Sequence, residues 1–388
     1  MPYIPRLLGQ ELVRAARRFK AVILTGPRRS GKTTLVRRLF PRARYFLLED
    51  PDIIARVRAD PRGFLDEINP PVILDEIQNV PELFSYIRTR MDGGGGKRGP
   101  WLLTGSQEAP LMKGVTESLA GRAATFHLLP LSCRETSRVS LFRGGFPEVI
   151  ARPALASVWF RSYIQTYLER DVRAVTAIKN LATFRRFLML LASRCGGMLN
   201  RSDLATPLGV SIPTVSEWLN ILEITAQIVL VPPYFENFGK RLVKSPKVYF
   251  VDSGLACHLL GMESAAMLEK SPFLGPFLEG WVAAEIMKHQ LNCGRARELY
   301  YFRDRTGLEV DFLVPGRKQS LILAEIKAAR TVRPEDAGPL RHLARAIPGR
   351  AVRGFVVHRA PAGGQATHAL SPGVSAVNLE EFLDILDG

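Results

Sequence analysis

The chain has 388 residues, which is too long for one ordinary hydrophobic core, so we expect two or three domains. It carries 53 Lys and Arg against 37 Asp and Glu, a net charge of 53 − 37 = +16, which favours a polyanion or an anionic membrane surface as partner and makes nucleic acid the first candidate. No apolar run approaches the roughly 18 residues of a membrane span, and the N-terminal segment is amphipathic rather than signal-like. We therefore expect a cytoplasmic protein without a membrane partner.

The four cysteines are Cys133, Cys195, Cys257 and Cys293. They lie far apart, with neither a C-x-x-C pair nor histidines at the spacing of a zinc site. We expect no zinc site, and small buried thiols in a reducing compartment.

Residues 26–34, GPRRSGKTT, fit the pattern G-x-x-x-x-G-K-[ST] of a phosphate-binding loop. The apolar run before them predicts a buried parallel strand over 21–25, and the spacing after them predicts a helix, which is the setting that this loop requires. The loop amides would face phosphates, with Lys32 on the β and γ oxygens and the Thr33 hydroxyl on Mg²⁺. A chance glycine–lysine loop is the alternative. The candidate nucleotide-binding residues are Gly26, Pro27, Arg28, Arg29, Ser30, Gly31, Lys32, Thr33 and Thr34.

A second apolar strand, over 72–74, ends at Asp75 and Glu76. Asp75 is placed to hold magnesium, directly or through water, and Glu76 to polarise the attacking water. The alternative is an ordinary acidic turn. No [NT]-K-x-D segment of the guanine-reading kind is present, so ATP is the expected nucleotide, with Mg²⁺ as its cofactor.

A third apolar strand is expected over 101–107, and it ends in small polar residues. We choose Ser106 as the sensor of the γ-phosphate, with Thr104 as the second candidate. Arg122 follows this strand and could enter a neighbouring subunit's site to neutralise charge on the γ-phosphate, the alternative being a surface arginine. Arg170 is a second candidate for contacting the nucleotide, and a local salt bridge with Asp171 or Glu169 is its alternative.

These segments resemble a family of bacterial and archaeal AAA+-type P-loop ATPases whose C-terminal region is the domain of unknown function DUF4143. The likeness covers nearly the whole chain and rests on GPRRSGKTTL, VILDEIQ, LLTGSQ, LAGR, GGFPE, YIQTYLERDVR, KRLVKSPKVYFVDSGLA and EVDFLV. The resemblance implies a homo-oligomeric ATPase, with a hexameric ring as one form, and a tail directed at DNA. It implies a machine rather than a particular cellular task.

The middle of the chain predicts a helical lid or linker over 131–183 and a winged helix over 184–260. Ser202 would cap the first helix of a helix-turn-helix, Gly209 would make its turn, and residues 214–222 would form the second helix. The outward face of that second helix is poor in Arg and Lys, which argues against base reading. Its residues are Thr214, Ser216, Glu217 and Asn220.

The segment after this unit predicts a β-hairpin wing with four cations that could contact phosphates without selecting bases. They are Lys240, Arg241, Lys244 and Lys247. Winged helices also bind proteins, so a protein contact is the alternative.

In the last third of the chain, helices and strands alternate again, and acidic residues fall in a pattern. Asp311 lies on one strand, Glu325 and Lys327 lie on the next, and Glu279, or alternatively Glu285, lies on the preceding helix. This layout resembles the PD-(D/E)XK nucleases, in which two carboxylates bind a divalent cation and the lysine activates a water. The alternative is a DNA-binding or oligomerising scaffold whose carboxylates only form ion pairs.

In that alternative, the ion-pair partners would be Lys327, Arg303 or Arg305.

Taken together, these patterns predict an α/β protein made of a P-loop NTPase domain with a parallel sheet, a helical lid, a winged helix-turn-helix and a restriction-endonuclease-like α/β domain. The expected boundaries are 1–130 for the AAA+ ATPase domain, 131–183 for the lid, 184–260 for the winged helix and 261–388 for the nuclease-like domain.

Three functions follow from these expectations. The first is an ATPase that binds DNA, branched DNA included, and remodels it or translocates along it. The second is a metal-dependent nuclease gated by ATP. The third is a nucleotide switch that binds a protein partner, as in a toxin–antitoxin or defence module.

Overall fold

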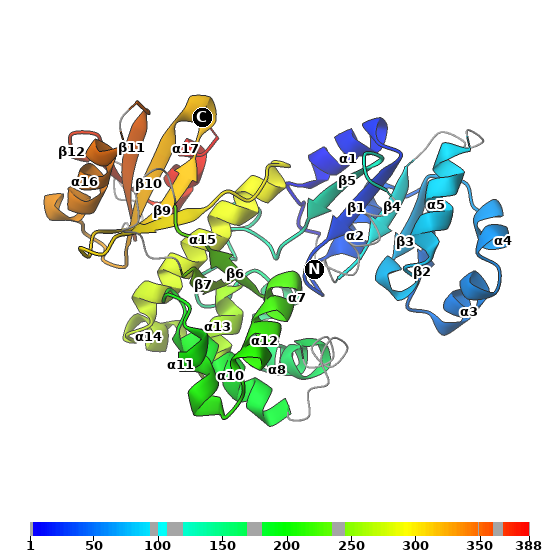
Figure 1. Ribbon diagram of the computed structural model, residues 1–388, viewed down its shortest axis with the longest axis horizontal. Coiled ribbons are helices and arrows are strands. Elements are labelled where there is room, and N and C mark those ends of the chain that lie inside the picture. Colours follow the sequence, from blue (N-terminus) through cyan, green and yellow to red (C-terminus); the bar gives the residue numbers. More distant parts are fainter. Residues whose placement is uncertain are drawn as a thin grey trace. The chain divides into compact units, whose positions relative to one another are not determined.

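The computed structural model of the protein describes residues 3–93, 100–106, 119–168, 181–234, 245–347, 349–359 and 368–387. The chain forms two compact units (Figure 1). The first consists of Met1–Leu131, Ile224–Ala226 and Leu291–Arg295, and the second of Ser132–Glu223, Gln227–Gln290 and Ala296–Gly388. Within the described ranges, no helix is both long and apolar enough to cross a membrane.

The first unit is built on a parallel sheet with helices on both faces (Figure 1). Its described strands are β1 (Ala21–Thr25), β2 (Arg44–Leu47), β3 (Val72–Asp75), β4 (Trp101–Thr104) and β5 (Ala123–His127), in the order β2-β3-β4-β1-β5. Every neighbouring pair is parallel. The helices are α1 (Gly9–Arg18), α2 (Lys32–Leu39), α3 (Pro51–Ala59), α4 (Pro61–Asp66) and α5 (Leu83–Asp92), with the 3-10 turn η1 (Ile77–Asn79). The predicted P-loop α/β fold is confirmed.

Alternation along the central strands divides the core of this unit into two layers. In β1, Val22 and Leu24 pack with residues of α1 and α2, whereas Ile23 packs with residues of α3, α4 and α5. Because both faces of the sheet are covered, its central strands are continuous apolar runs, and this pattern is what predicts β1, β3 and β4. The edge strands β2 and β5 are only partly buried, and the sequence pattern does not predict them.

The second unit begins with the described part of the predicted lid. This segment contains the helices α7 (Pro147–Ala151), η2 (Pro153–Leu155) and α8 (Ala156–Tyr163) and the π-helical turn η3 (Ile164–Leu168). The helices that follow it in the second unit are α10 (Leu181–Ser193), α11 (Arg201–Leu208), α12 (Ile212–Ile224), α13 (Ser253–Leu259) and α14 (Ala265–Glu269). Phe160 of α8 stacks on His258 of α13, with ring centroids 5.6 Å apart. The Tyr163 hydroxyl accepts a hydrogen bond from the Gln227 amide at 3.0 Å. The segment therefore packs within the second unit.

Helices α11 and α12 form a helix-turn-helix. Gly209 ends α11 with φ of +65°, a left-handed conformation that glycine adopts without strain, and the Ser211 hydroxyl accepts the Thr214 N–H at 3.2 Å. The predicted cap of α11 is wrong by two residues, because Asn200 caps the helix by accepting the Ser202 N–H at 3.0 Å. The apolar face of α12 is buried and consists of Val215, Trp218, Leu219, Ile221 and Leu222.

Strand β6 (Ile228–Val231) pairs antiparallel with β7 (Lys247–Phe250), while residues 235–244 lie outside the described part of the chain. The tail is a mixed sheet whose described strands run in the order β12-β13-β11-β10-β9-β8, as expected for an α/β domain. These strands are β8 (Tyr300–Arg303), β9 (Glu309–Pro315), β10 (Leu321–Lys327), β11 (Val352–His358), β12 (His368–Ser371) and β13 (Val374–Val377). The helices are α15 (Leu274–Asn292), α16 (Gly338–Ala346) and α17 (Leu379–Ile385), with the 3-10 turns η5 (Arg317–Gln319) and η6 (Pro334–Ala337).

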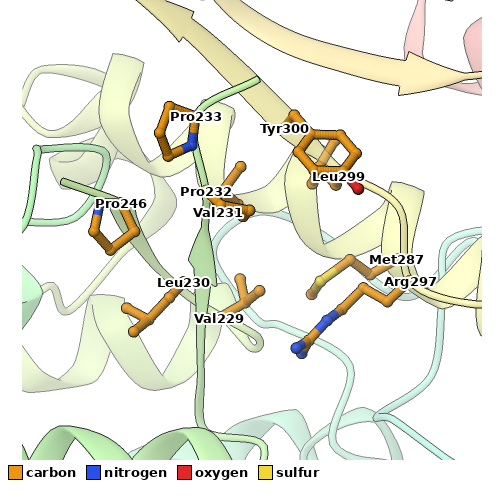
Figure 2. Close-up of a pocket in the computed structure, with 10 residues that line it drawn as sticks. All are labelled: Val229, Leu230, Val231, Pro232, Pro233, Pro246, Met287, Arg297, Leu299 and Tyr300. Carbon is orange, nitrogen blue, oxygen red and sulfur yellow. The ribbon is translucent and has the colours of Figure 1, made fainter. Parts of the chain in front are cut away.

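The wing is hydrogen-bonded to the tail sheet. After β6 the chain continues through Pro232 and Pro233 (Figure 2), and Pro233 forms a β-bridge with Tyr301 of β8. The Tyr301 N–H donates to the Pro232 carbonyl at 3.1 Å, and the Tyr234 N–H donates to the Tyr301 carbonyl at 2.7 Å. The Tyr301 hydroxyl donates to the Ser245 carbonyl, just ahead of β7. These bonds fix the backbone of the wing against the tail.

The cysteines differ in exposure. Cys195 and Cys257 are buried, Cys133 is half-buried and Cys293 is exposed, so the expectation of buried thiols is wrong for Cys293. Burial raises the pKa of the Cys195 thiol to about 12, which keeps it protonated and unreactive at neutral pH.

Candidate functional site

The phosphate-binding loop connects β1 to α2 at the carboxyl end of the parallel sheet, where such sheets bind ligands. Gly26 has φ of +141°, and a Cβ at this position would lie 2.2 Å from the carbonyl oxygen of Leu128, so only glycine fits. Gly31, with φ of +97°, leads directly into α2. The Ser30 hydroxyl is buried and has no hydrogen-bond partner among the described residues. A phosphate oxygen would supply that partner, so the loop fits a nucleotide.

Lys32 and Thr33 begin α2 and lie over the loop and beside β3. The Lys32 ammonium donates to the carbonyl oxygens of Gly26 and Pro27, both at 3.0 Å. The Thr33 hydroxyl donates to Oδ2 of Asp75 at 2.7 Å. The two groups expected to share a magnesium ion are thus adjacent, and both offer the hard oxygen ligands that Mg²⁺ prefers.

Three hydroxyl groups surround the buried carboxylate of Asp75. Besides Thr33, the Tyr45 hydroxyl donates to Oδ2 at 2.8 Å, and the Thr104 hydroxyl donates to Oδ1. Burial, and then the hydrogen bond to Asp75, raise the pKa of Tyr45, which keeps this side chain a donor. Tyr45 lies on the edge strand β2, and its segment RYFL gives no signal that it faces a carboxylate, so the sequence does not predict this contact.

Glu76 follows β3 with φ of +57°, which is uncommon for a residue other than glycine and is typical of functional sites. Its Oε2 accepts hydrogen bonds from the Ser106 hydroxyl, at 2.8 Å, and from the Gln78 amide. Burial raises the pKa of Glu76, but the charge of Lys32 and the bonds from Gln78 and Ser106 leave it below its ordinary value. The carboxylate is therefore ionised at neutral pH and held in place by two donors, as a base that polarises water requires.

The structure thus gathers Lys32, Thr33, Asp75, Glu76 and Ser106 around the loop. The hydroxyl of Thr104, the second sensor candidate, donates to the Asp75 carboxylate and accepts the backbone N–H of Glu76 at 3.4 Å. Gln78 is the further member that the sequence analysis missed, although its position two residues after Glu76 in DEIQ could have indicated it.

The remaining loop residues are more peripheral. The Arg28 guanidinium lies 3.8 Å from the Glu49 carboxylate. Arg29 has φ of +63° and is exposed, Thr34 is exposed, and Pro27 is buried.

Arg122 forms a double ion pair with Asp92 inside the first unit. Its Nε lies 2.8 Å from Oδ1 and its Nη2 lies 3.0 Å from Oδ2, which lowers the pKa of Asp92. The pair is bidentate, but both side chains are exposed, so solvent screens it and it holds the guanidinium less firmly than a buried pair would. Arg170, the second candidate, lies outside the described residues.

In the second unit, the antiparallel pairing of β9 and β10 ends at Phe312 and Ala324, and Asp311 and Glu325 are the neighbouring residues on the two strands. Asp311 Oδ2 accepts the N–H of Ile326 at 2.8 Å. Glu325 Oε1 accepts from the Lys327 ammonium at 2.8 Å. These three predicted residues of the nuclease-like site are therefore adjacent.

Glu279 of α15 joins them through Lys247. Its Oε1 accepts from the Lys247 ammonium at 2.8 Å and from the Tyr249 hydroxyl, and the same ammonium lies 3.7 Å from Asp311 Oδ1. Burial, and then the charge of Asp311, raise the pKa of Glu279 to about 7, and the same two causes raise the pKa of Glu325 to about 7. These carboxylates repel one another, as expected where a cation binds.

Two predictions about this region are corrected. Lys247 was expected on an exposed wing in contact with DNA phosphates, but its side chain is 3% exposed and lies among Glu279, Glu309 and Asp311. Glu285, the alternative to Glu279, lies elsewhere, since it accepts from the Cys133 N–H and from Lys288.

The other predicted wing cations, Lys240, Arg241 and Lys244, lie outside the described residues. On α12, Thr214 and Ser216 are half-buried, and Glu217 and Asn220 are exposed. Four exposed arginines on and around α10 and α11 were not predicted, because they do not form a cluster in the sequence: Arg185, Arg186, Arg194 and Arg201. In the tail, Arg305 is exposed, and Arg303 pairs with Glu309 at 3.0 Å.

A cavity of about 410 Å³ lies beside β6 in the second unit (Figure 2). Its wall is mainly apolar, with Val229, Val231, Met287 and Leu299 among the lining residues, and Arg297 is its cation. Among the described residues that line the cavity there is no carboxylate, so these residues offer no pair of groups for acid–base chemistry.

Family models match three parts of the chain: an AAA domain over residues 18–137, a domain of unknown function (DUF8612) over 134–266, and a domain of unknown function (DUF4143) over 274–380. Together with the loop and the parallel sheet, the AAA match defines a P-loop ATPase.

Relatives extend this match over most of the chain. Uncharacterized proteins of Mycobacterium tuberculosis (Rv2008c) and Mycobacterium bovis (Mb2031c) are each 33% identical over 311 residues, which are 78% of this chain and 69% of theirs. An uncharacterized protein of Methanocaldococcus jannaschii (MJ1544) is 20% identical over 348 residues, 78% of this chain and 74% of its own. The chain belongs to this family of AAA-type P-loop ATPases with a C-terminal DUF4143 domain, which confirms the resemblance seen in the sequence.

Solved structures are similar at lower identity. The Walker-type ATPase of Pyrococcus abyssi matches 65% of this chain and 94% of its own, with 16% identity and a TM-score of 0.44. The RuvB Holliday junction branch migration motor of Thermotoga maritima matches 58% of this chain and 89% of its own, with 18% identity and a TM-score of 0.31.

The contact between Ser106 and Glu76 predicts a defect in turnover rather than in binding. Replacing Ser106 by Ala removes one of the two donors that hold Glu76 and lower its pKa. We expect kcat for ATP hydrolysis to fall roughly 10- to 100-fold, with unchanged nucleotide affinity. The acid limb of the pH profile of kcat should move to higher pH, because Glu76 then becomes protonated at higher pH.

The matched control is Thr89→Ala, which removes a hydroxyl from α5 of the same unit, where it bonds the Ser85 carbonyl. This variant should keep wild-type kcat. A Ser106→Ala enzyme with wild-type kcat and pH profile would contradict the assignment, as would a loss confined to nucleotide affinity.

Proposed function

We propose that this P-loop ATPase uses Mg²⁺ and works as a homo-oligomer that binds DNA and remodels it or translocates along it, with branched DNA as a preferred form. The observation that carries the proposal is the winged-helix region with its exposed arginines, in the same chain as a complete phosphate-binding site. The net charge of +16 supports a polyanionic partner.

The residues of the loop divide the work of hydrolysis among them. Magnesium would neutralise charge on the phosphates, and the hydroxyl of Thr33 and the carboxylate of Asp75 would hold it. Lys32 would bind phosphate oxygens by exchanging its present loop carbonyls for them. Glu76 would accept a proton from the attacking water, and Ser106 and Gln78 would keep its carboxylate oriented.

The DNA contact is proposed for the winged-helix region. The exposed positions of α12 are Ile212, Pro213, Glu217 and Asn220, which do not offer the arginine or lysine typical of base reading. Arg194 directly follows α10 and Arg201 is the first residue of α11, and both are exposed, so they can contact phosphates. Binding through phosphates favours recognition of DNA structure over recognition of sequence.

An oligomer would explain the position of Arg122. Its pair with Asp92 is exposed and screened by solvent, so the guanidinium can leave it for the γ-phosphate of a neighbouring subunit. A hexameric ring is one arrangement that would place the Arg122 guanidinium there.

If subunits complete one another's sites in this way, the specific ATPase activity rises with protein concentration as the oligomer assembles. A specific activity that stays constant over the concentration series would contradict the shared site.

Replacing Arg194 and Arg201 together by Gln should weaken DNA binding and its dependence on salt. The logarithm of the DNA association constant falls linearly with the logarithm of salt concentration, and each lost phosphate contact reduces the steepness of this fall by about 0.9. Loss of both arginines should therefore reduce the steepness by about 2. Fluorescence anisotropy with labelled branched, duplex and single-stranded DNA over a salt series measures this slope.

The control pair is Arg341→Gln with Arg353→Gln, the same change of charge at exposed positions of the tail. If the winged-helix pair binds as the wild type does, these arginines do not carry the DNA. If the wild type binds none of the DNAs, the proposal fails and a protein partner becomes the candidate, to be sought by co-purification.

A metal-dependent nuclease is a second candidate function, because the fold brings Glu279, Asp311, Glu325 and Lys327 together. Oε2 of Glu325 is buried without a hydrogen-bond partner in the described structure, as an oxygen reserved for a cation would be. A divalent cation, when bound, would supply Lewis acidity toward a phosphodiester. The Lys327 ammonium could then orient a water or stabilise the charge that develops on the phosphate.

Under this second candidate, Asp311→Asn and Glu325→Gln should each reduce Mg²⁺- or Mn²⁺-dependent cleavage of labelled DNA by about 100-fold. Both replacements keep the size of the side chain, and in Asp311→Asn the amide oxygen can still accept the Ile326 N–H. Glu335→Gln, an exposed acid of the same domain, should cleave as the wild type does. A wild-type protein that cuts no DNA in either metal would eliminate this function.

A further inference from the structure

Lys247 is the most enclosed cation of the carboxylate cluster in the tail. Its ammonium lies 2.7 Å from Glu309 Oε1, 2.8 Å from Glu279 Oε1 and 3.7 Å from Asp311 Oδ1, and its side chain is 3% exposed. It also lies 5.5 Å from the centre of the Tyr301 ring. A lysine is almost never buried so deeply unless carboxylates surround it.

The origin of this lysine is unexpected. The carboxylates come from α15 and β9 of the tail, whereas Lys247 is the first residue of β7, in the wing. A cation from the winged-helix region therefore occupies the space between two of the acids that would hold a metal.

The cluster retains acceptor capacity beyond this lysine. Glu325 is 9% exposed, its Oε1 is bonded to Lys327, and its Oε2 has no hydrogen-bond partner within the described part of the chain. Buried carboxylate oxygens are normally satisfied, so this oxygen points to a missing cation or donor. The described carboxylates Glu279, Glu309, Asp311 and Glu325 outnumber their cations Lys247, Lys327 and Arg303.

We propose that Lys247 and a divalent cation compete for Glu279 and Asp311. With the ammonium between them the cluster is closed, and when it withdraws, Glu279, Asp311 and Glu325 hold the metal. The two states exclude each other, because an ammonium and a divalent ion that share the same carboxylates repel each other strongly at such short distances. This inference rests on the second candidate function, since it concerns the metal that the nuclease-like site would use.

The surroundings of Lys247 allow its side chain to move while its backbone stays in place. Lys247 pairs with Val231 in the hairpin, and Tyr301 is bonded on both sides of the wing, to Pro232 and to Ser245. Glu309 offers the ammonium a second position, because it lies at the rim, with a side chain that is 30% exposed and bonded to Arg303 at 3.0 Å. A swing toward Glu309 would open the cluster without unfolding the wing.

The test is Mn²⁺ binding to the full-length protein, measured by calorimetry and by the loss of the free Mn²⁺ resonance, without nucleotide or DNA. Lys247→Met removes the competing charge and keeps an unbranched apolar side chain. We expect the dissociation constant of Mn²⁺ at this site to fall at least 10-fold from the wild-type value. Adding Asp311→Asn to Lys247→Met should remove the gained site, which separates it from Mn²⁺ at the phosphate-binding loop.

Lys288→Met is the matched control. Lys288 is also 3% exposed and bonds a buried carboxylate, Glu285, at 2.8 Å, but Glu285 does not belong to the cluster. This variant should bind Mn²⁺ as the wild type does. Because Lys247→Met can fail to fold, Glu309→Gln is the second variant, and by removing the charge toward which Lys247 withdraws it should weaken Mn²⁺ binding about threefold.

Equal Mn²⁺ affinity in the wild type, the Glu309→Gln variant and any folded Lys247→Met variant would overturn the proposal, whether that affinity is high or negligible. Tighter binding that survives the addition of Asp311→Asn would also overturn it. The nuclease function fails on a different observation, the absence of DNA cleavage, so the two failures can be told apart.

Discussion

A carboxylate buried at the end of a strand must be matched by donors or cations, and this requirement shapes both chemical centres of the protein. Removing an ion from water costs several kcal/mol or more, and only close partners offset that cost. Asp75 is matched by the hydroxyls of Thr33, Tyr45 and Thr104. Asp311 is matched by a backbone N–H and by the ammonium of Lys247. The chemistry available to each centre follows from the kind of partner it has.

Neutral hydroxyls leave the negative charge of Asp75 uncompensated by a neighbouring ion pair, so a metal can approach it beside the Thr33 hydroxyl. A lysine does the opposite, because it neutralises Glu279 and Asp311 and occupies their space. The first unit therefore holds its acid among neutral donors, whereas the second holds its acids around an internal cation. That cation comes from β7, whose backbone is bonded to the tail on both sides, so only the Lys247 side chain needs to move to uncover these acids.

Contiguous signals in the sequence predicted most of the nucleotide site. The glycines, Lys32 and Thr33 lie within one loop, and Asp75 and Glu76 directly follow an apolar strand, so the parallel sheet places them at one edge. Tyr45 and Lys247 could not be predicted in this way, because each contacts an acid far away in the sequence and lies in a segment with an ordinary pattern. The prediction for Lys247 was wrong, because a basic hairpin in the sequence indicates an exposed surface. Lys247 is buried instead, because the folded tail surrounds its ammonium with acids.

If the protein acts on DNA, its ATP turnover is coupled to DNA, and steady-state ATP hydrolysis is the measurement that decides this. The rate is measured in Mg²⁺ at moderate salt, alone and with single-stranded, duplex and branched DNA, with Lys32→Ala as the blank. We predict a rate that DNA increases, most strongly when the DNA is branched. A protein that hydrolyses ATP at the same rate with and without every DNA would contradict it.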